Sequence, residues 1–282
     1  MFWSRYRAGN GLGARLGRLI ALLHLGFRLL LILLIVDLFY LAVTWPDWKQ
    51  IAAGPVPKSG FIGDYQHEHR EHRDLPPLRW QPVPLSAVPK YLIRAVILAE
   101  DSRFYEHSGF DLIAFKEAMD LNFTEGRLAA GGSTLSQQTV KNLFLSSSRN
   151  PLRKWHELIL TWGMEQNLSK HRILEIYLNV AEFGQGIYGV QAAAQAYWGV
   201  NVERLSPTRA AELAATLPSP VKNNPVTRTQ SFDKRYQRVL RLLTLYPGDA
   251  ADAMTGADAL VPASEDRSPA GGERAAPETT QI

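Results

Sequence analysis

Three acids, an arginine and a histidine lie between residues 100 and 107, directly after an apolar run that ends at Leu98. A carboxylate that ends an apolar helix loses hydration, which raises its pKa and its strength as a base while it stays ionised. Arg103 would act in the opposite direction, because a nearby cation favours the charged carboxylate. Glu100 is therefore either a general base for proton abstraction or part of a solvated helix end.

A second group of polar residues begins at the glycine pair 131–132, where positive φ or close backbone approach is possible. Small hydroxyl and amide side chains follow, and such a group can hold polyol or phosphate oxygens: Ser133, Thr134, Ser136, Gln137 and Gln138. Ser133 or Thr134 could equally be the N-cap of a helix. Both interpretations are compatible, since a helix N-terminus binds anions. Lys141 would share a helix face with Gln138.

Basic residues gather next, at Arg149, Arg153 and Lys154, and Glu157 follows them. Arg153 and Glu157 are four residues apart, so a surface ion pair on one helix is the simpler interpretation. The alternative is a cationic cluster for a diphosphate with a second carboxylate beside it. The spacing alone leaves both open.

The elements that must position these groups read as helices. Apolar spacing and caps predict helices at 91–98, 110–124, 151–168, 170–180, 187–197, 207–217 and 232–245. No segment shows a convincing two-residue period, so the predicted fold class is mainly α. Asn179, at the end of the 170–180 helix, is expected to line a cleft.

Bulk composition excludes several chemistries. The chain has 282 residues, a net charge of +4 and no cysteine, so disulfides, zinc–thiolate sites and thiol catalysis are excluded. The small basic excess suits an anionic membrane surface or a phosphate-bearing substrate, and it is too small to indicate nucleic acid.

The N-terminal region predicts a membrane anchor. Residues 1–18 are basic, and the apolar run 19–45 is long enough to cross a bilayer core of roughly 30 Å, although Arg28 and Asp37 interrupt it. A cleaved signal peptide is the alternative, but the run is long and no small-x-small site follows it directly. Basic residues before the span favour a cytoplasmic N-terminus and an extracytoplasmic domain.

The remaining segments divide by composition. Residues 46–89 are rich in proline and are expected to be a connector without a long helix, followed by a domain at 90–246. The histidine-rich stretch 67–72 is either a metal site or a solvated loop, since its spacing matches no helical zinc motif. Residues 247–282 lack a periodic apolar face and are expected to be disordered.

Five motifs occur in order at 100–109, 131–138, 153–157, 170–179 and 209–213. Their order and spacing resemble the family 51 glycosyltransferases over roughly residues 90–225. Segments 139–145 and 177–184 look especially like the monofunctional biosynthetic peptidoglycan transglycosylase branch. The absence of room for a transpeptidase domain is expected for the same branch. One departure is Leu135-Ser136, where the family usually has Ile-Thr or Ile-Ser; this exchange keeps the bulk and the hydroxyl.

The resemblance implies a lysozyme-like helical glycosyltransferase domain that polymerises lipid II into β-1,4-linked glycan by inverting displacement of undecaprenyl pyrophosphate. By position, Glu100 matches the general base and Glu157 the second essential glutamate. Residues that match those proposed to hold the donor pyrophosphate are Lys141, Arg149, Arg153 and Lys154. Gln137, Ser133 and Thr134 match the motif that lines the cleft. No tightly bound cofactor is implied, but a divalent cation, Mg or Mn, is plausible at the pyrophosphate.

The resemblance also implies a place and partners. We expect a single-pass protein of the bacterial inner membrane with a periplasmic catalytic domain, acting on lipid II and nascent glycan beside other cell-wall synthesis and division proteins. A mobile lobe at 110–127 would either dip apolar side chains into lipid or pack them inward. Two rival functions are a glycan-cleaving lytic transglycosylase or lysozyme-like enzyme, which has no pyrophosphate to neutralise, and a non-catalytic scaffold, which would not need both glutamates with their surrounding motifs intact.

Overall fold

A computed structural model describes residues 10–127, 131–145 and 151–247, and the chain divides into two units, residues 1–50 and 51–282. The basic residues before position 10, Arg149 and the tail from 248 lie outside the described residues.

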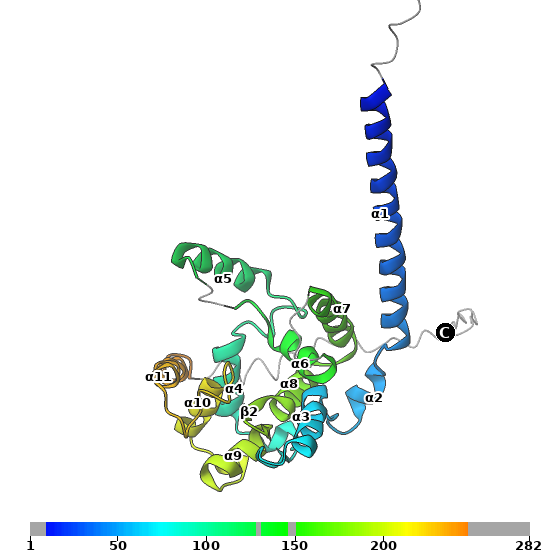
Figure 1. The fold of residues 1–282 in the computed structure, drawn as a ribbon. Coiled ribbons are helices and arrows are strands. Elements are labelled where there is room, and N and C mark those ends of the chain that lie inside the picture. Colours follow the sequence, from blue (N-terminus) through cyan, green and yellow to red (C-terminus); the bar gives the residue numbers. More distant parts are fainter. Residues whose placement is uncertain (1–9, 128–130, 146–150, 248–282) are drawn as a thin grey trace, which may run out of the picture. The chain divides into compact units, whose positions relative to one another are not determined.

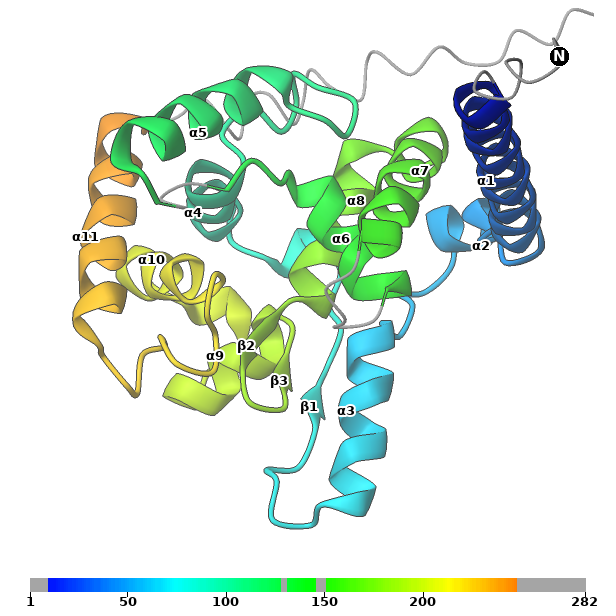
Figure 2. The ribbon, with the colours of Figure 1, turned by 45° about the horizontal axis from the view of Figure 1, so that its top comes forward.

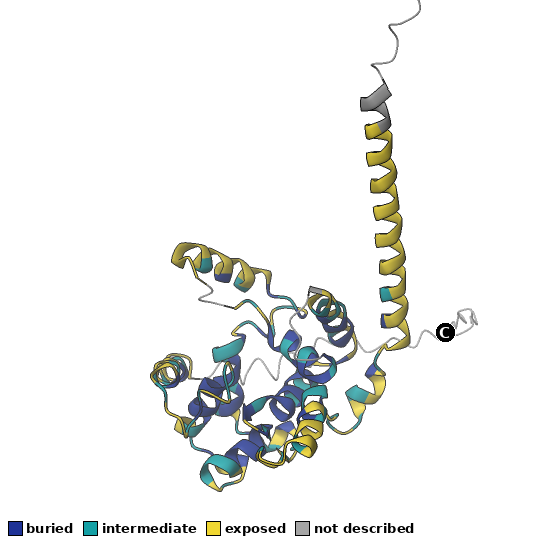
Figure 3. Cartoon of the chain, in the orientation of Figure 1, coloured by how far each residue is buried: buried dark blue, intermediate teal, exposed yellow. Residues whose placement is uncertain are grey.

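The first unit is dominated by one long helix, α1 (Asn10–Val43). Its segment Arg15–Val43 has 29 residues and is long and apolar enough to cross a membrane. At 1.5 Å per residue it measures roughly 40 Å, more than the hydrocarbon core requires. Its described side chains are almost all exposed (Figure 3), as expected for a helix whose apolar surface faces lipid.

In the second unit, α4 (Lys90–Glu100) packs against α10 (Pro207–Thr216) and α11 (Gln230–Leu245) (Figure 1). Alanines on α10 are fully buried, and their small side chains let α4 approach closely. Ser206 caps α10 and Pro207 occupies its first turn, where proline is well tolerated. Helices α10 and α11 therefore hold the end of α4, and with it Glu100, against a packed core.

Beside them, α6 (Leu135–Phe144) contacts both α7 (Pro151–Asn167) and α8 (Lys170–Val180). The range of α8 is the one that the sequence predicted, because Ser169 caps its start and accepts a hydrogen bond from Arg172 N. Ile173, Leu174 and Tyr177 of α8 are buried at helical spacing. These three helices carry most of the polar motifs.

Four shorter elements are also helical: α2 (Trp48–Ala53), α9 (Val190–Trp198), and 3₁₀ turns at Leu85–Ala87 and Val202–Arg204. A further helix, α5 (Leu112–Glu125), stands at the opposite end of this unit from the strands (Figures 1 and 2). The predicted mainly α class is confirmed.

The structure adds a small sheet that the sequence analysis did not expect. Strands β1 (Arg79–Trp80), β3 (Ile187–Tyr188) and β2 (Glu182–Gly184) lie in that order. β1 pairs parallel to β3, with Arg79 opposite Ile187, and β2 pairs antiparallel to β3. Strands of two or three residues are too short to show a two-residue period, which is why the pattern missed them.

The expectation that residues 46–89 contain no long helix is wrong. Helix α3 (Gly60–Glu71) has 12 residues, starts at the N-cap Ser59 and packs against α6. The prolines that flank it lie outside its bounds, so they limit the helix without preventing it. The histidine-rich stretch therefore begins in a helix, with His67 Nδ1 3.6 Å from Glu71 Oε1 on an exposed face. The segment from residue 51 groups with the second unit, whereas the sequence analysis treated it as a connector.

Candidate active site

Glu100 is the last residue of α4, and its side chain is only 9% exposed. Gln138 Nε2 donates a hydrogen bond to Oε2 over 3.0 Å, and Arg235 donates one to Oε1 over 3.0 Å. The alternative of a solvated helix end is therefore excluded.

Burial raises the pKa of the Glu100 carboxyl, and the hydrogen bonds from Gln138 and Arg235 and the charge of Lys141 partly offset this effect. Arg103, which the sequence suggested as the opposing cation, instead binds Asp111 through two hydrogen bonds of 2.9 and 2.6 Å. Burial therefore strengthens the carboxylate as a base, while the donors favour its ionised form, and a general base requires both.

Gln138 has a fixed orientation. The Tyr177 hydroxyl donates to Gln138 Oε1 over 3.2 Å, so the amide nitrogen must face Glu100 as a donor. Tyr177 is buried, and burial raises its pKa well above its usual value, so the phenol stays protonated. The chain Tyr177–Gln138–Glu100 thus links the core to the candidate base.

The polar motif at the start of α6 has a structural role in part. Thr134 is the N-cap: its hydroxyl accepts from Gln137 N, and the Gln137 side chain accepts from Thr134 N over 3.0 Å. Gln137 is buried in this capping box, so the structure gives it a partner other than substrate. Ser133 is exposed. The expected cleft-lining role thus fits Ser133 but not Gln137.

A cavity of about 180 Å³ opens beside Glu100. Its lining includes Glu100, Asp101, Ser133, Thr134 and Arg238. Gly132 lies so close to α5 that an added Cβ would be 3.1 Å from the Phe115 Cα, which explains the need for glycine there. The cavity is polar, borders the candidate base and has room for a hydroxyl-bearing ligand group.

The second carboxylate, Glu157, is buried on α7 and surrounded by cations. Lys154 Nζ lies 2.5 Å from Oε1, and Arg153 Nη1 lies 3.5 Å from Oε2. The expected i, i+4 pair therefore exists, but it belongs to a larger cluster in which several cations face one acid. That surplus of positive charge suits a ligand with two or more negative charges.

Lys141 interacts electrostatically with both carboxylates, Glu100 and Glu157. Burial lowers the pKa of its ammonium, Glu157 and Glu100 raise it, and Arg153 and Lys154 lower it again. Because the charge of Lys141 interacts with both acids, it couples the two halves of the site. The structure therefore brings together Glu100, Lys141, Arg153, Lys154 and Glu157.

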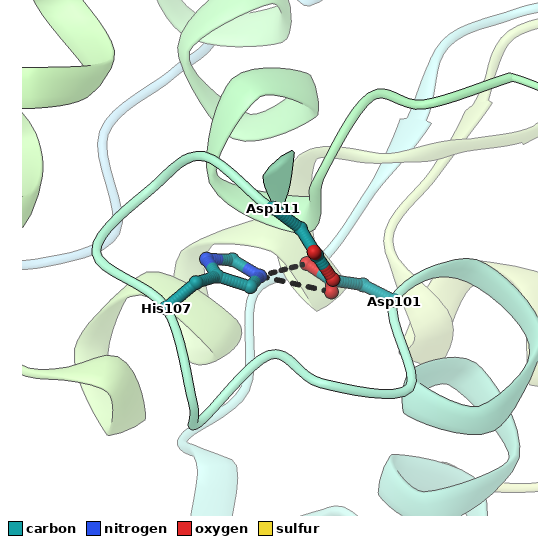
Figure 4. Close-up of side chains that lie close together, drawn as sticks. All are labelled: Asp101, His107 and Asp111. Atoms are coloured by element: carbon teal, nitrogen blue, oxygen red, sulfur yellow. Dashed lines mark hydrogen bonds and ion pairs between the residues drawn. The ribbon is translucent and has the colours of Figure 1, made fainter. Parts of the chain in front are cut away.

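Asp101 directly follows Glu100, and its side chain lies beside those of His107 and Asp111 (Figure 4). His107 Nε2 lies 3.0 Å from Asp101 Oδ1, and Leu135 N donates to Asp101 Oδ2 over 2.9 Å. Asp111 caps α5 by accepting from Ala114 N over 2.8 Å. These contacts tie the segment after Glu100 to the starts of α5 and α6.

Asp101, His107 and Asp111 are close enough to hold a metal ion, since their donor atoms lie within 4.8 Å of one another. Their lone pairs are already used: Asp111 binds the Arg103 guanidinium and two backbone N–H groups, and Asp101 binds His107 and Leu135 N. A divalent cation would have to displace these donors and lie beside Arg103. The side chains do not fit a cation here.

Asn179 is not placed for substrate binding. Its side chain is fully buried, donates to Val83 O over 2.8 Å and accepts from Val83 N over 2.8 Å. Arg209, in the fifth motif, lies over the Trp198 ring at 5.5 Å. In the described part of the chain, the side chains of Asn179 and Arg209 contact other protein groups and stabilise the fold.

Sequence reasoning missed Arg235 and Arg238, which come from α11, and the specific role of Gln138. Arg235 is 135 residues from Glu100, so no spacing rule connects them. For Arg238, a signal was available in the basic residues Lys234, Arg238 and Arg241 at helical spacing within the predicted helix 232–245, but this row does not include Arg235.

Comparison with known proteins gives a consistent result. Residues 70–244 match the family described as Transglycosylase. The chain is 43% identical over 182 residues to a biosynthetic peptidoglycan transglycosylase of Nitrosospira multiformis, covering 64% of this chain and 79% of that protein. It is 41% identical over 212 residues to a protein of the same description in Janthinobacterium sp. (strain Marseille), covering 75% and 90%. The chain therefore belongs to the transglycosylase family.

Proposed function

We propose that this chain is a peptidoglycan glycosyltransferase that polymerises lipid II into β-1,4-linked glycan. The acceptor 4-hydroxyl oxygen attacks the anomeric carbon of the donor, and Glu100 takes the hydroxyl proton. The bond from that carbon to the undecaprenyl pyrophosphate breaks, and the α-linkage becomes a β-linkage in one displacement. The observation that carries the proposal is the buried Glu100, held by Gln138 and Arg235 and coupled through Lys141 to the cations around Glu157.

The cations supply the second requirement of this reaction. Negative charge develops on the departing pyrophosphate, and positive groups already in place stabilise it without reorganisation. Lys141, Arg153 and Lys154 form that set, and the resemblance adds Arg149. Glu157 holds the set together, since it contacts two of its members directly.

The same cluster favours this function over its rivals. A glycan-cleaving enzyme with a lysozyme-like domain needs a carboxylic acid and no site for a diphosphate. A scaffold has no need of a buried carboxylate with oriented donors, because burying such groups costs stability.

A divalent cation at the pyrophosphate, when bound, would supply further charge neutralisation. The carboxylates in the described part of the site do not offer a ligand set for it, because the oxygens of both glutamates already accept hydrogen bonds or ion pairs.

We propose a single membrane span at α1, in the bacterial inner membrane, with a cytoplasmic N-terminus and the catalytic unit in the periplasm. The basic residues before the span support this orientation. On α5, Leu112, Phe115 and Phe123 are 76%, 53% and 78% exposed. An exposed apolar helix of this kind suits contact with the bilayer that carries the lipid-linked substrate. Of the two alternatives for this lobe, the exposure supports lipid contact.

The test is polymerisation of fluorescent lipid II by the detergent-solubilised full chain, beside Glu100→Gln, which keeps the side-chain shape. We expect long glycan from the wild type and a rate lower by roughly 10²–10⁴-fold in the variant. Cleavage of preformed glycan without polymerisation would support the hydrolase instead. Inactivity on both substrates, with the protein folded, would support the scaffold.

A further inference from the structure

An apolar groove of about 390 Å³ lies on α7, next to the site but outside the mechanism above. Phe110, Leu158, Ile159 and Trp162 line it. Trp162 is 56% exposed, which is costly for a large aromatic ring unless something covers it.

Close backbone packing builds the groove. Gly109 has φ +90°, and an added Cβ would lie 2.8 Å from Thr161 Cγ2 and 3.0 Å from Glu165 Cγ. Only glycine lets this loop rest directly on α7. The next residue is Phe110, so its ring is held against the helix and forms one wall of the groove.

The groove continues from the cationic cluster on the same ridge of the helix. Leu158 and Trp162 follow Lys154 at four and eight residues, so the three side chains lie in one row. Lys154 binds Glu157 at one end of the row. From Lys154 to Trp162 the helix rises roughly 12 Å. Along this row of the helix, a cationic end is thus followed by apolar side chains that line the groove.

We infer that this groove binds the isoprenoid chain of the donor, at the units next to the pyrophosphate. The inference rests on the proposed function and extends it to the lipid part of the substrate. A polyprenyl pyrophosphate is an anionic head joined directly to a linear run of apolar, methyl-bearing isoprene units, which matches the row from Lys154 to Trp162 in charge and in order. A bilayer surface needs no such order, and it would not select a concave lane that starts at an ammonium.

The consequence is positional. A donor held at both its pyrophosphate and its first isoprene units cannot rotate about the cationic cluster, so its anomeric carbon keeps one direction toward the acceptor.

The inference can be tested by photolabelling the full chain in detergent with an isoprenoid diphosphate that carries a benzophenone near the diphosphate. We expect labelled residues within 158–162 on α7. Trp162→Ala should reduce that labelling about tenfold, because it removes most of an aromatic wall. Trp162→Phe should keep most of it, and an unchanged melting temperature will show that both variants fold.

Phe123→Ala on α5 is the matched control, since it removes an exposed aromatic ring outside the groove and should leave labelling of α7 unchanged. A benzophenone-tagged isoprenoid alcohol without the diphosphate should not label α7. If the alcohol labels α7 equally well, or if diphosphate labelling is confined to α5 and α1, the groove is a bilayer contact and the inference is overturned. Lipid II polymerisation by the wild type is measured separately, so failure of the proposed function remains distinguishable.

Discussion

Arg235 on α11 donates a hydrogen bond to Glu100 at the end of α4, over 3.0 Å and across 135 residues of sequence. The other carboxylate oxygen accepts from Gln138 on α6. The proton affinity of the candidate base is therefore set by three helices together. Burial raises the pKa of Glu100, and the hydrogen bonds from the charged Arg235 and the neutral Gln138 lower it.

The first prediction concerns Arg235→Gln. Arg235 lowers the pKa of Glu100, so its removal should raise that pKa further. The base works only when ionised, and the acid limb of the kcat–pH profile should therefore move to higher pH. Activity at neutral pH should fall, while activity at higher pH should recover in part. The measurement is lipid II polymerisation across the pH range.

Lys234→Gln is the control for this prediction, because it removes a neighbouring exposed positive charge on the same helix. Its acid limb should coincide with that of the wild type. An unshifted limb in Arg235→Gln would show that Arg235 does not tune the base.

The second prediction concerns Tyr177→Phe. The change leaves Gln138 Oε1 without its donor in a buried site and should cost about 1–3 kcal/mol of stability. Without that donor the Gln138 amide can turn, so that an oxygen faces Glu100 and raises the pKa of its carboxyl. We expect a lower melting temperature together with a raised acid limb.

Gln138→Leu separates the loss of stability from the change in pH profile. It removes the amide and should shift the acid limb of the kcat–pH profile to higher pH whether or not Tyr177 is present. The double variant should then show no further shift in pH profile. An additive shift would mean that Tyr177 reaches Glu100 by another route.

The extent to which the sequence predicts this site depends on how local each interaction is. Glu100 and Lys141 stand out because an apolar helix end and a helical spacing from Gln138 are visible in a few residues. Helix α8 is predicted to the residue because its cap and its apolar face are also local. Arg235 is invisible, because helix packing alone brings it to Glu100.

The prediction that Gln137 and Asn179 line the cleft fails for a related reason. Amide side chains serve ligands and backbone equally well, and here a capping box and the Val83 backbone use them. Helix α3 was missed because proline density was averaged over 46–89, although Gly60–Glu71 itself contains none. Composition over a long window cannot exclude a short capped helix.

The third prediction concerns Glu157→Gln, studied in the Glu100→Gln background to separate binding from chemistry. Glu157 raises the pKa of Lys141, so its loss should let that pKa fall further. Lys141 would then lose its charge at a lower pH, and donor affinity should decline earlier as pH rises. The measurement is the Kd for lipid II at increasing pH, from neutral towards about 10.4, the usual pKa of a lysine.

Glu165→Gln is the matched control on the same helix, since it removes a buried carboxylate whose partners are Lys170 and Ser136. It should lower stability without moving the pH dependence of the Kd. Equal shifts in both variants would indicate a general loss of packing on α7 rather than a specific effect on Lys141.

The fourth prediction uses Glu182, at the start of β2 and away from the proposed chemistry. Burial raises its pKa to about 7, whereas an exposed glutamate in the unfolded chain titrates near about 4.3. The folded state therefore binds the proton more tightly, and stability falls as pH rises from the unfolded to the folded pKa. Above about pH 7 the charged carboxylate costs up to roughly 4 kcal/mol.

Glu182→Gln removes this cost while it keeps the shape of the neutral acid. The variant should melt at a higher temperature than the wild type at pH about 8, and the two should converge at pH about 4, where both carry a neutral group. Glu203→Gln, at an exposed position in the Val202–Arg204 turn, should change neither value. A stabilisation that is equal at both pH values would refute the burial argument, because only an ionisable group can make the difference depend on pH.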